Sequence, residues 1–163
     1  MAHPLSLAQS MNIVDATAGC VTTNGGVTSD YVSLKNVQKA FIILQLTQAV
    51  GHATVIAIRQ ALTVAGGSVK AIVGTPEWWE NEDTAASDAL VKQTAAVSLT
   101  MAADIKKKLV ICEIDPALLD LANSFDCLNF TVSDSSEATN FVSATFVLLN
   151  RYQQSTPPVA ITD

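Results

Sequence analysis

Two consecutive runs with alternating side chains constrain the fold of this chain more than any other feature. Residues 39–48 and 52–62 flank a short turn, and apolar residues recur at every second position in both runs. A period of two is typical of β-strands, because successive side chains point to opposite faces of a sheet. A glycine-containing turn of about three residues between two such strands predicts a β-hairpin. We therefore expect an all-β framework.

The first of these runs carries large apolar side chains on both of its sides. Ile42, Leu44 and Leu46 alternate with Phe41 and Ile43. A half-buried antiparallel strand usually has one apolar side and one polar side. We therefore expect both faces to meet packed surface, either within the domain or against a neighbouring chain.

The rest of the chain adds further strand patterns and one helix signal. The Asp115-Pro116 step predicts a short helix of about two turns, since Asp is a favoured N-cap and Pro a favoured first helical residue. The whole pattern indicates an antiparallel β-sandwich or jelly roll of about seven to eight strands with one short helix. The additional strands are expected within 31–34, 69–73, 97–101, 109–114, 125–132 and 138–152.

The chain divides into three parts. Residues 1–30 contain the turn signal Asn24-Gly25 and show no clear periodicity, so we expect an extended N-terminal arm that docks on the body or reaches a neighbour. Residues 31–152 are expected to form the β-sandwich domain. Residues 153–163 contain Pro157-Pro158, which predicts a polar, extended C-terminal tail.

Charged residues make up only 15% of the 163-residue chain, whereas hydrophobic residues make up 49%. An ordinary soluble chain carries roughly 25% charged residues. The shortfall favours a surface that is partly covered in an obligate assembly, although a sandwich with a Ser, Thr, Asn and Gln surface also accounts for it. We expect a homo-oligomer, with a trimer as one candidate state.

Net charge and hydropathy argue against two kinds of partner. The formal net charge is −6, whereas a nucleic-acid-binding surface needs an excess of cationic side chains. The longest uncharged stretch, 40–58, is interrupted by polar residues and has a period of two, so we expect no membrane helix. The N-terminus shows no secretory signal pattern. We therefore expect a protein made in a cytoplasm.

The sequence shows no recognisable catalytic constellation. Its two histidines, His3 and His52, lie in a terminus and in a predicted turn, and neither a Gly-x-Ser-x-Gly elbow nor a phosphate-binding glycine loop is present. We therefore expect neither an enzyme nor a cofactor. The three cysteines are widely spaced, which predicts buried inert thiols rather than a metal or redox site.

A long loop is predicted over 74–88, because this acidic and aromatic segment lacks strand periodicity. Carboxylate oxygens are good ligands for divalent cations, but the acidic residues here lack the spacing of a calcium loop, so we expect no metal site. The acidic residues are Glu77, Glu80, Glu82, Asp83 and Asp88.

Two adjacent tryptophans, Trp78 and Trp79, stand out in this loop. One arrangement packs one ring on the domain and leaves the other exposed or touching a partner, because tryptophan is enriched at the energetic centres of interfaces. In the alternative arrangement both rings pack on their own domain. A carbohydrate-binding module that uses this pair is an alternative from another functional class. The candidate partner contacts are Trp78, Trp79, Glu80, Met11, Ile13 and Tyr152.

The order of these patterns resembles that of a known group of proteins. A polar lead-in precedes 31–36 and the two runs within 41–62, a Trp-bearing loop follows, and the 109–115 strand is joined to its short helix before the last strand ends at Arg151-Tyr152. This order is similar to that of small, mostly all-β structural proteins of tailed bacteriophages, encoded among the head genes near the major capsid protein. The resemblance covers about residues 30–152 and lies in pattern and order rather than in an invariant motif.

The resemblance implies a virion structural protein, with head decoration as the first expectation. Such a cement protein would bind the major capsid protein on the outer surface of the head and stabilise contacts between capsomers. Neck, tail or head-fibre base components are the alternatives within the same particle. The resemblance also implies synthesis in the cytoplasm of a bacterial host and a final location in the virion head, and it implies no catalytic residue.

Overall fold

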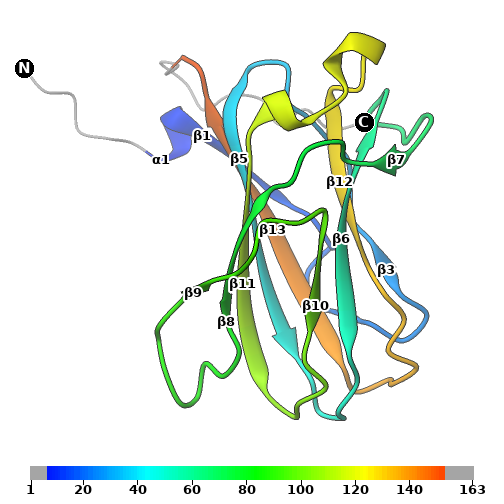
Figure 1. The fold of residues 1–163 in the computed structure, drawn as a ribbon, viewed down its shortest axis with the longest axis vertical. Helices are drawn as coiled ribbons and strands as arrows, with labels where there is room; N and C mark the ends of the chain where they lie inside the picture. The colour runs from blue at the N-terminus through cyan, green and yellow to red at the C-terminus, as the bar shows by residue number, and fades with distance from the viewer. Residues whose placement is uncertain (1–6, 153–163) are drawn as a thin grey trace, which may run out of the picture.

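A computed structural model describes residues 7–152, which form two antiparallel sheets packed face to face (Figure 1). Sheet A contains β1 (Met11–Asp15), β2 (Val21–Thr22), β5 (Val37–Thr47), β8 (Glu77–Asn81), β9 (Val91–Lys92), β11 (Lys107–Ile114) and β13 (Phe141–Asn150). Sheet B contains β3 (Val27–Thr28), β4 (Val32–Ser33), β6 (Thr54–Ala61), β7 (Lys70–Ala71), β10 (Ser98–Met101) and β12 (Cys127–Val132).

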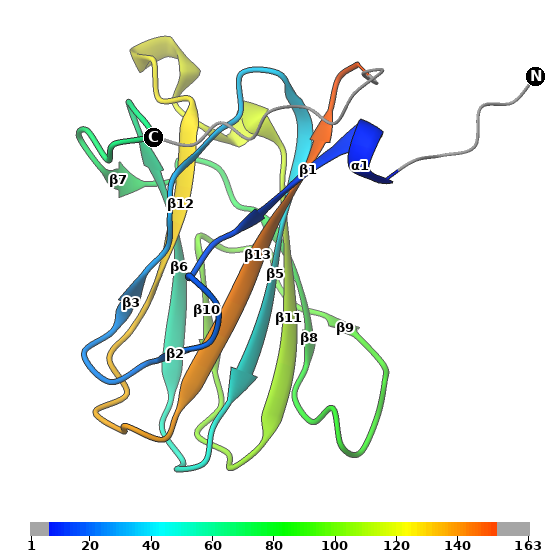
Figure 2. The ribbon, with the colours of Figure 1, turned by 180° about the vertical axis from the view of Figure 1, so that it is seen from behind.

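The strands of sheet A lie in the order β1-β13-β5-β11-β8-β9, with β2 also paired to β13. Sheet B has the order β10-β6-β12-β3, with β4 paired to β12 and β7 paired to β6. The two layers stand side by side in both views (Figures 1 and 2). The predicted all-β sandwich is confirmed. The strands outnumber the predicted seven to eight for two reasons. β2, β3 and β9 are only two residues long, which is too short to show a period, and the five-residue strands β1 and β8 lie in segments predicted as an arm and a loop.

The predicted hairpin between the two most periodic runs is wrong. Both strands exist, but β5 pairs with β11 and β13 in sheet A, whereas β6 pairs with β10 and β12 in sheet B. The connection between them therefore crosses from one layer to the other. Gln48 closes this crossing, because its Nε2 donates to the His52 carbonyl at 2.6 Å. Gly51 is needed there, since a Cβ would lie 2.6 Å from the Ala103 carbonyl oxygen.

The core explains why the two strands separate. Ile42, Leu44 and Leu46 of β5 and Ile56 and Ile58 of β6 are all buried in one apolar cluster. In a sandwich, the inward side chains of one sheet pack against those of the other sheet. The inward residues of β5 and β6 can therefore contact each other across the core when the two strands belong to different sheets. Sheets A and B also meet through an edge-to-face aromatic contact between Phe146 and Phe130, with ring centroids 5.8 Å apart.

The predicted loop over 74–88 contains a strand, which corrects that expectation. β8 pairs with β11 in a register that sets Trp78 opposite Cys112 and Trp79 opposite Ile111. The predicted two-turn helix after Asp115 is also wrong, because the chain there forms two short 3-10 helices, η1 (Pro116–Leu118) and η2 (Leu121–Asn123). Asp115 does act as the predicted N-cap, since its carboxylate accepts from the Ala117 amide at 2.8 Å.

The range 1–30 was expected to be an extended arm, and its described part docks on the body. After the one-turn helix α1 (Leu7–Ser10), β1 and β2 pair with β13, and β3 pairs with β12. β1 forms an edge of sheet A, visible in dark blue beside β13 in Figure 2. The predicted tail, 153–163, lies outside the described residues.

Two of the three cysteines match the prediction of buried thiols. Burial raises the pKa of the Cys112 thiol well above its usual range, and burial together with Asp126 raises the pKa of Cys127 to about 12. These two side chains are therefore neutral thiols at physiological pH. Cys20 is exposed, so the prediction is wrong for this residue.

Candidate interaction surface

The outer face of sheet A is apolar, although it points away from the core. Along β5, β11 and β13, inward residues are buried and the residues between them are partly exposed. Each of five adjacent strands carries at least one large apolar residue on this outward side, beside polar ones such as Gln45 and Thr145, and we call the apolar residues together the apolar face. Its members are Met11, Ile13, Phe41, Ile43, Trp79, Leu109, Ile111, Val147 and Leu149.

The register brings these side chains into continuous rows across the strands. Trp79 lies opposite Ile111, which in turn lies opposite Ile43. A second row sets Phe41 opposite Val147, and Val147 opposite Ile13. Neighbouring strands are about 4.8 Å apart and same-face residues pack across them, so each row is an apolar contact three strands wide. The first row ends at Thr145, which lies opposite Ile43, and the second ends at Glu113, which lies opposite Phe41.

Exposure shows that this surface is not covered by the chain's own described residues. Most members are half-buried by their lateral neighbours, and Ile13 on the edge strand β1 is 51% exposed. Contiguous exposed apolar patches are common at interaction sites of soluble proteins. The apolar face is therefore the candidate interaction surface of the described residues.

Two of the charge pairs on this face are closed within the chain. Lys39 forms an ion pair with Glu113, and its Nζ lies 5.5 Å from the centre of the Phe41 ring. At the other side, Lys92 Nζ is 3.1 Å from a Glu77 carboxylate oxygen and 5.5 Å from the centre of the Trp79 ring. The face is therefore locally neutral, even though the chain carries a net charge of −6.

The structure brings together three of the six predicted contact residues. Met11, Ile13 and Trp79 all lie on the apolar face. Trp78 and Glu80 point to the opposite side of β8, where Trp78 is completely buried and donates from Nε1 to the Ala96 carbonyl at 2.7 Å. The two tryptophan rings thus lie on opposite faces of one strand and do not form a single binding platform.

Tyr152, the sixth predicted contact, follows the end of β13 and is 78% exposed. Sequence reasoning did not single out the central residues of the apolar face as contacts. A signal was present, since Phe41 and Ile43 give β5 an apolar outer side where an ordinary strand is polar. Ile111 and Val147 repeat that signal on the two strands that pair with β5.

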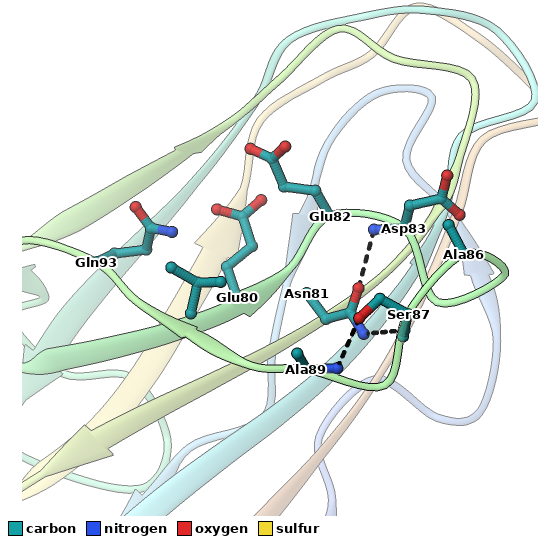
Figure 3. A pocket seen from close by; sticks show the side chains of 9 residues that line it. Glu80, Asn81, Glu82, Asp83, Ala86, Ser87, Ala89 and Gln93 are labelled. Atoms are coloured by element: carbon teal, nitrogen blue, oxygen red, sulfur yellow. Dashed lines mark hydrogen bonds between the residues drawn. The ribbon is translucent and has the colours of Figure 1, made fainter.

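A separate acidic cavity of about 400 Å³ lies between β8 and the loop that leads to β9 (Figure 3). Glu80 is only 4% exposed, and its Oε1 has no hydrogen-bond partner among the described residues. Burial raises the pKa of Glu80, the neighbouring charge of Glu82 raises it further, and Lys108 opposes the shift. Glu80 therefore keeps its proton to higher pH than an ordinary glutamate does.

The acidic residues of this segment do not converge on one point. Figure 3 shows the Glu80 and Glu82 carboxylates on the same side as Gln93, whereas Asp83 lies at the other end of the cavity. Asn81 holds the loop by donating from Nδ2 to the Ser87 carbonyl at 2.6 Å. Within residues 7–152, no group of three or more His, Cys, Asp or Glu side chains is arranged to hold a metal ion.

The helices of the described part of the chain are short. Within residues 7–152 we find no helix with the length and apolar character needed to cross a membrane.

No known protein family matches the sequence, and no curated protein matches it either. Among solved structures, the crystal structure of the SPBc2 prophage-derived protein YomS is similar to this chain. The two are 10% identical, the match covers 92% of this chain and 99% of that chain, and the TM-score is 0.46. An identity and a TM-score this low do not by themselves indicate a common function.

Proposed function

We propose that this chain is a virion structural protein of a tailed bacteriophage that decorates the head. In this role it binds the major capsid protein on the outer surface of the shell, as a homo-oligomer, and stabilises contacts between capsomers. The apolar face is the observation that carries the assembled, homo-oligomeric state in this proposal, whereas the contact with the capsid rests on the low charge content and on the resemblance in strand order. A protein with such a face is suited to a permanent assembly rather than to life as a free monomer.

Two further observations support this role. Only 15% of the residues are charged, which fits a chain whose surface is shared with partners. The order of strands, Trp-bearing segment and final strand resembles that of small phage structural proteins. A rigid two-sheet body also suits a part that must hold its neighbours at fixed distances.

The stabilising effect follows from mass action. A protein that binds the closed shell, and binds it better than separated or rearranged capsomers, raises the free energy needed to open the shell. An oligomer that contacts several capsomers at once adds multivalency, so modest individual contacts produce a long-lived attachment.

Binding to heads that lack this protein tests the proposal. Purified protein is mixed with such heads, the heads are pelleted, and the bound chains are counted before the decorated heads are heated. We expect saturable binding at many sites per head and a higher temperature of shell opening. Failure of a folded, assembled preparation to bind contradicts the proposal. Saturation at only a few chains per head also contradicts it and indicates a neck or tail position.

A further inference from the structure

We propose that a second copy of this chain covers the apolar face, so that the outer faces of two sheets A pack against each other. This pairing names the contact that forms the homo-oligomer of the proposed function. It rests on the homo-oligomer in that proposal and not on binding to the capsid. The isolated protein is enough to test it. The sedimentation result for the isolated protein and the binding result with heads are therefore independent of each other.

The shape of the face suits another sheet. Its side chains stand in rows on five adjacent strands, from β1 through β13, β5 and β11 to β8. Two sheets with such rows interdigitate at a separation of about 10 Å, as sheets A and B already do on their inner sides. A second copy supplies the same rows without any change in the backbone.

The size of the face is sufficient for a stable pair. The five strands are 5 to 11 residues long, and at about 4.8 Å between strands and about 3.3 Å per residue their whole outer side, polar residues included, spans on the order of 600 Å². Two such faces together bury on the order of 1,200 Å², which lies at the lower bound of specific protein interfaces.

Charge also favours a second copy as the occupant. Charged side chains of both signs point outward from the described strands of sheet A. The cations are Lys39, Lys92 and Lys107, and the anions are Asp15, Glu77 and Glu113. Three cations balance three anions, and two of these pairs are closed within the chain. Two chains of net charge −6 can therefore meet at this face without like-charge repulsion.

A matched pair of lysine substitutions tests the surface. Ile43 lies outward at the middle of sheet A on β5, and Thr131 lies outward on β12 in the interior of sheet B. Both are β-branched and partly exposed. Ile43→Lys introduces a charge that cannot be buried in a paired face, whereas Thr131→Lys introduces the same charge on the other outer face. Circular dichroism establishes that each variant is folded.

Sedimentation velocity then reports the state of each protein. We expect the unmodified chain and Thr131→Lys to sediment as a pair of chains, and Ile43→Lys to sediment as a single chain. An unmodified protein that stays monomeric up to high micromolar concentration overturns the pairing and leaves a capsid subunit as the occupant. An oligomer that survives Ile43→Lys also overturns it, as does one with an odd number of chains.

Trp79 gives a second readout that needs no disruptive variant. Its ring lies on the apolar face, whereas the only other tryptophan, Trp78, is fully buried in the core. Dilution of the unmodified protein should shift the fluorescence emission to longer wavelength as the Trp79 ring becomes solvated. Trp79→Phe should remove this shift while keeping the emission of Trp78. Emission that is independent of concentration across the dissociation range contradicts a paired face.

Discussion

The outer faces of the two sheets differ sharply, although both belong to antiparallel sheets that share one core. The outer side of sheet B carries small or polar residues such as Ala57, Ser98, Thr100 and Thr131. The outer side of sheet A also has polar residues such as Gln45 and Thr145, but between them it carries large aliphatic and aromatic residues such as Phe41, Ile43 and Ile111. Folding requires only that the inner faces be apolar, so the composition of the outer face of sheet A reflects a demand other than folding.

The same contrast occurs within a single strand. On β8, Trp78 belongs to the core and Trp79 to the apolar face. We expect Trp78→Ala to destabilise the fold by about 3–5 kcal/mol, because it leaves a large cavity and an unpaired Ala96 carbonyl. Trp79→Ala should cost about 1 kcal/mol in the single chain and act chiefly on association. Denaturant unfolding measures both, and equal losses in the single chain would contradict the assignment of the two rings.

The next prediction concerns the stability of the assembled protein. If the apolar face is buried between copies, the melting temperature should fall by about 2 °C for each tenfold dilution, because dissociation is coupled to unfolding. Phe41→Ser should weaken this dependence, and Thr131→Ser on sheet B should leave it unchanged. Differential scanning fluorimetry over a dilution series provides the measurement. If the melting temperatures of the two variants depended equally on protein concentration, the outer faces of sheets A and B would not differ in their role in association.

A smaller effect is expected at the acidic cavity, which belongs to neither outer face. The pKa of Glu80 is raised in the folded protein, so the fold favours the protonated form. Stability should therefore fall as the pH rises from about 4.5 through the raised pKa. Glu80→Gln should remove this fall and raise the melting temperature at neutral pH by roughly 2 °C, with no gain near pH 4. A gain of the same size at both pH values would show that ionisation is not its cause.

The smallest expected effect lies at the Lys39–Glu113 pair on the apolar face. Both side chains remain partly exposed, and exposed ion pairs contribute about 0–1 kcal/mol. Glu113→Gln should therefore leave the unfolding free energy of the single chain nearly unchanged. It should weaken association modestly, because Lys39 then lacks its partner when the face is covered. Sedimentation at low and high salt measures the effect of the substitution on association, and denaturant unfolding measures its effect on the single chain. Tighter association of Glu113→Gln would contradict the view that charge pairing on the apolar face favours association.

The sequence allowed most of the longer strands to be found but not their neighbours in the sheets. The period of two in β5 and β6 correctly marked the inward sides, for example Ile42 and Ile56. It could not show that the two strands lie in opposite sheets, because the same alternation serves a hairpin and a crossing between layers equally well. β8 was missed for a related reason. Its sequence has charged residues on both sides of the Trp pair, and pairing with β11 supplies the strand.

The candidate surface was partly predictable. Met11, Ile13 and Trp79 were among the predicted contacts and lie together on the apolar face, and β5 was recognised as apolar on both sides. The sequence could not show that these residues form one surface, because the register between β1, β13, β5, β11 and β8 joins positions far apart in the chain. Trp78 and Glu80 could not be separated from Trp79 until their segment was known to be a strand.

Photo-crosslinking from position 43 tests the central claim most directly. A photoreactive amino acid replaces Ile43 at the middle of the apolar face, the purified protein is irradiated, and the linked peptides are identified by mass spectrometry. We predict links between two chains that join position 43 to outward residues of sheet A, such as Phe41 or Ile111. A sample that gives no chain-to-chain product, or links that fall on the outer side of sheet B, would contradict the account.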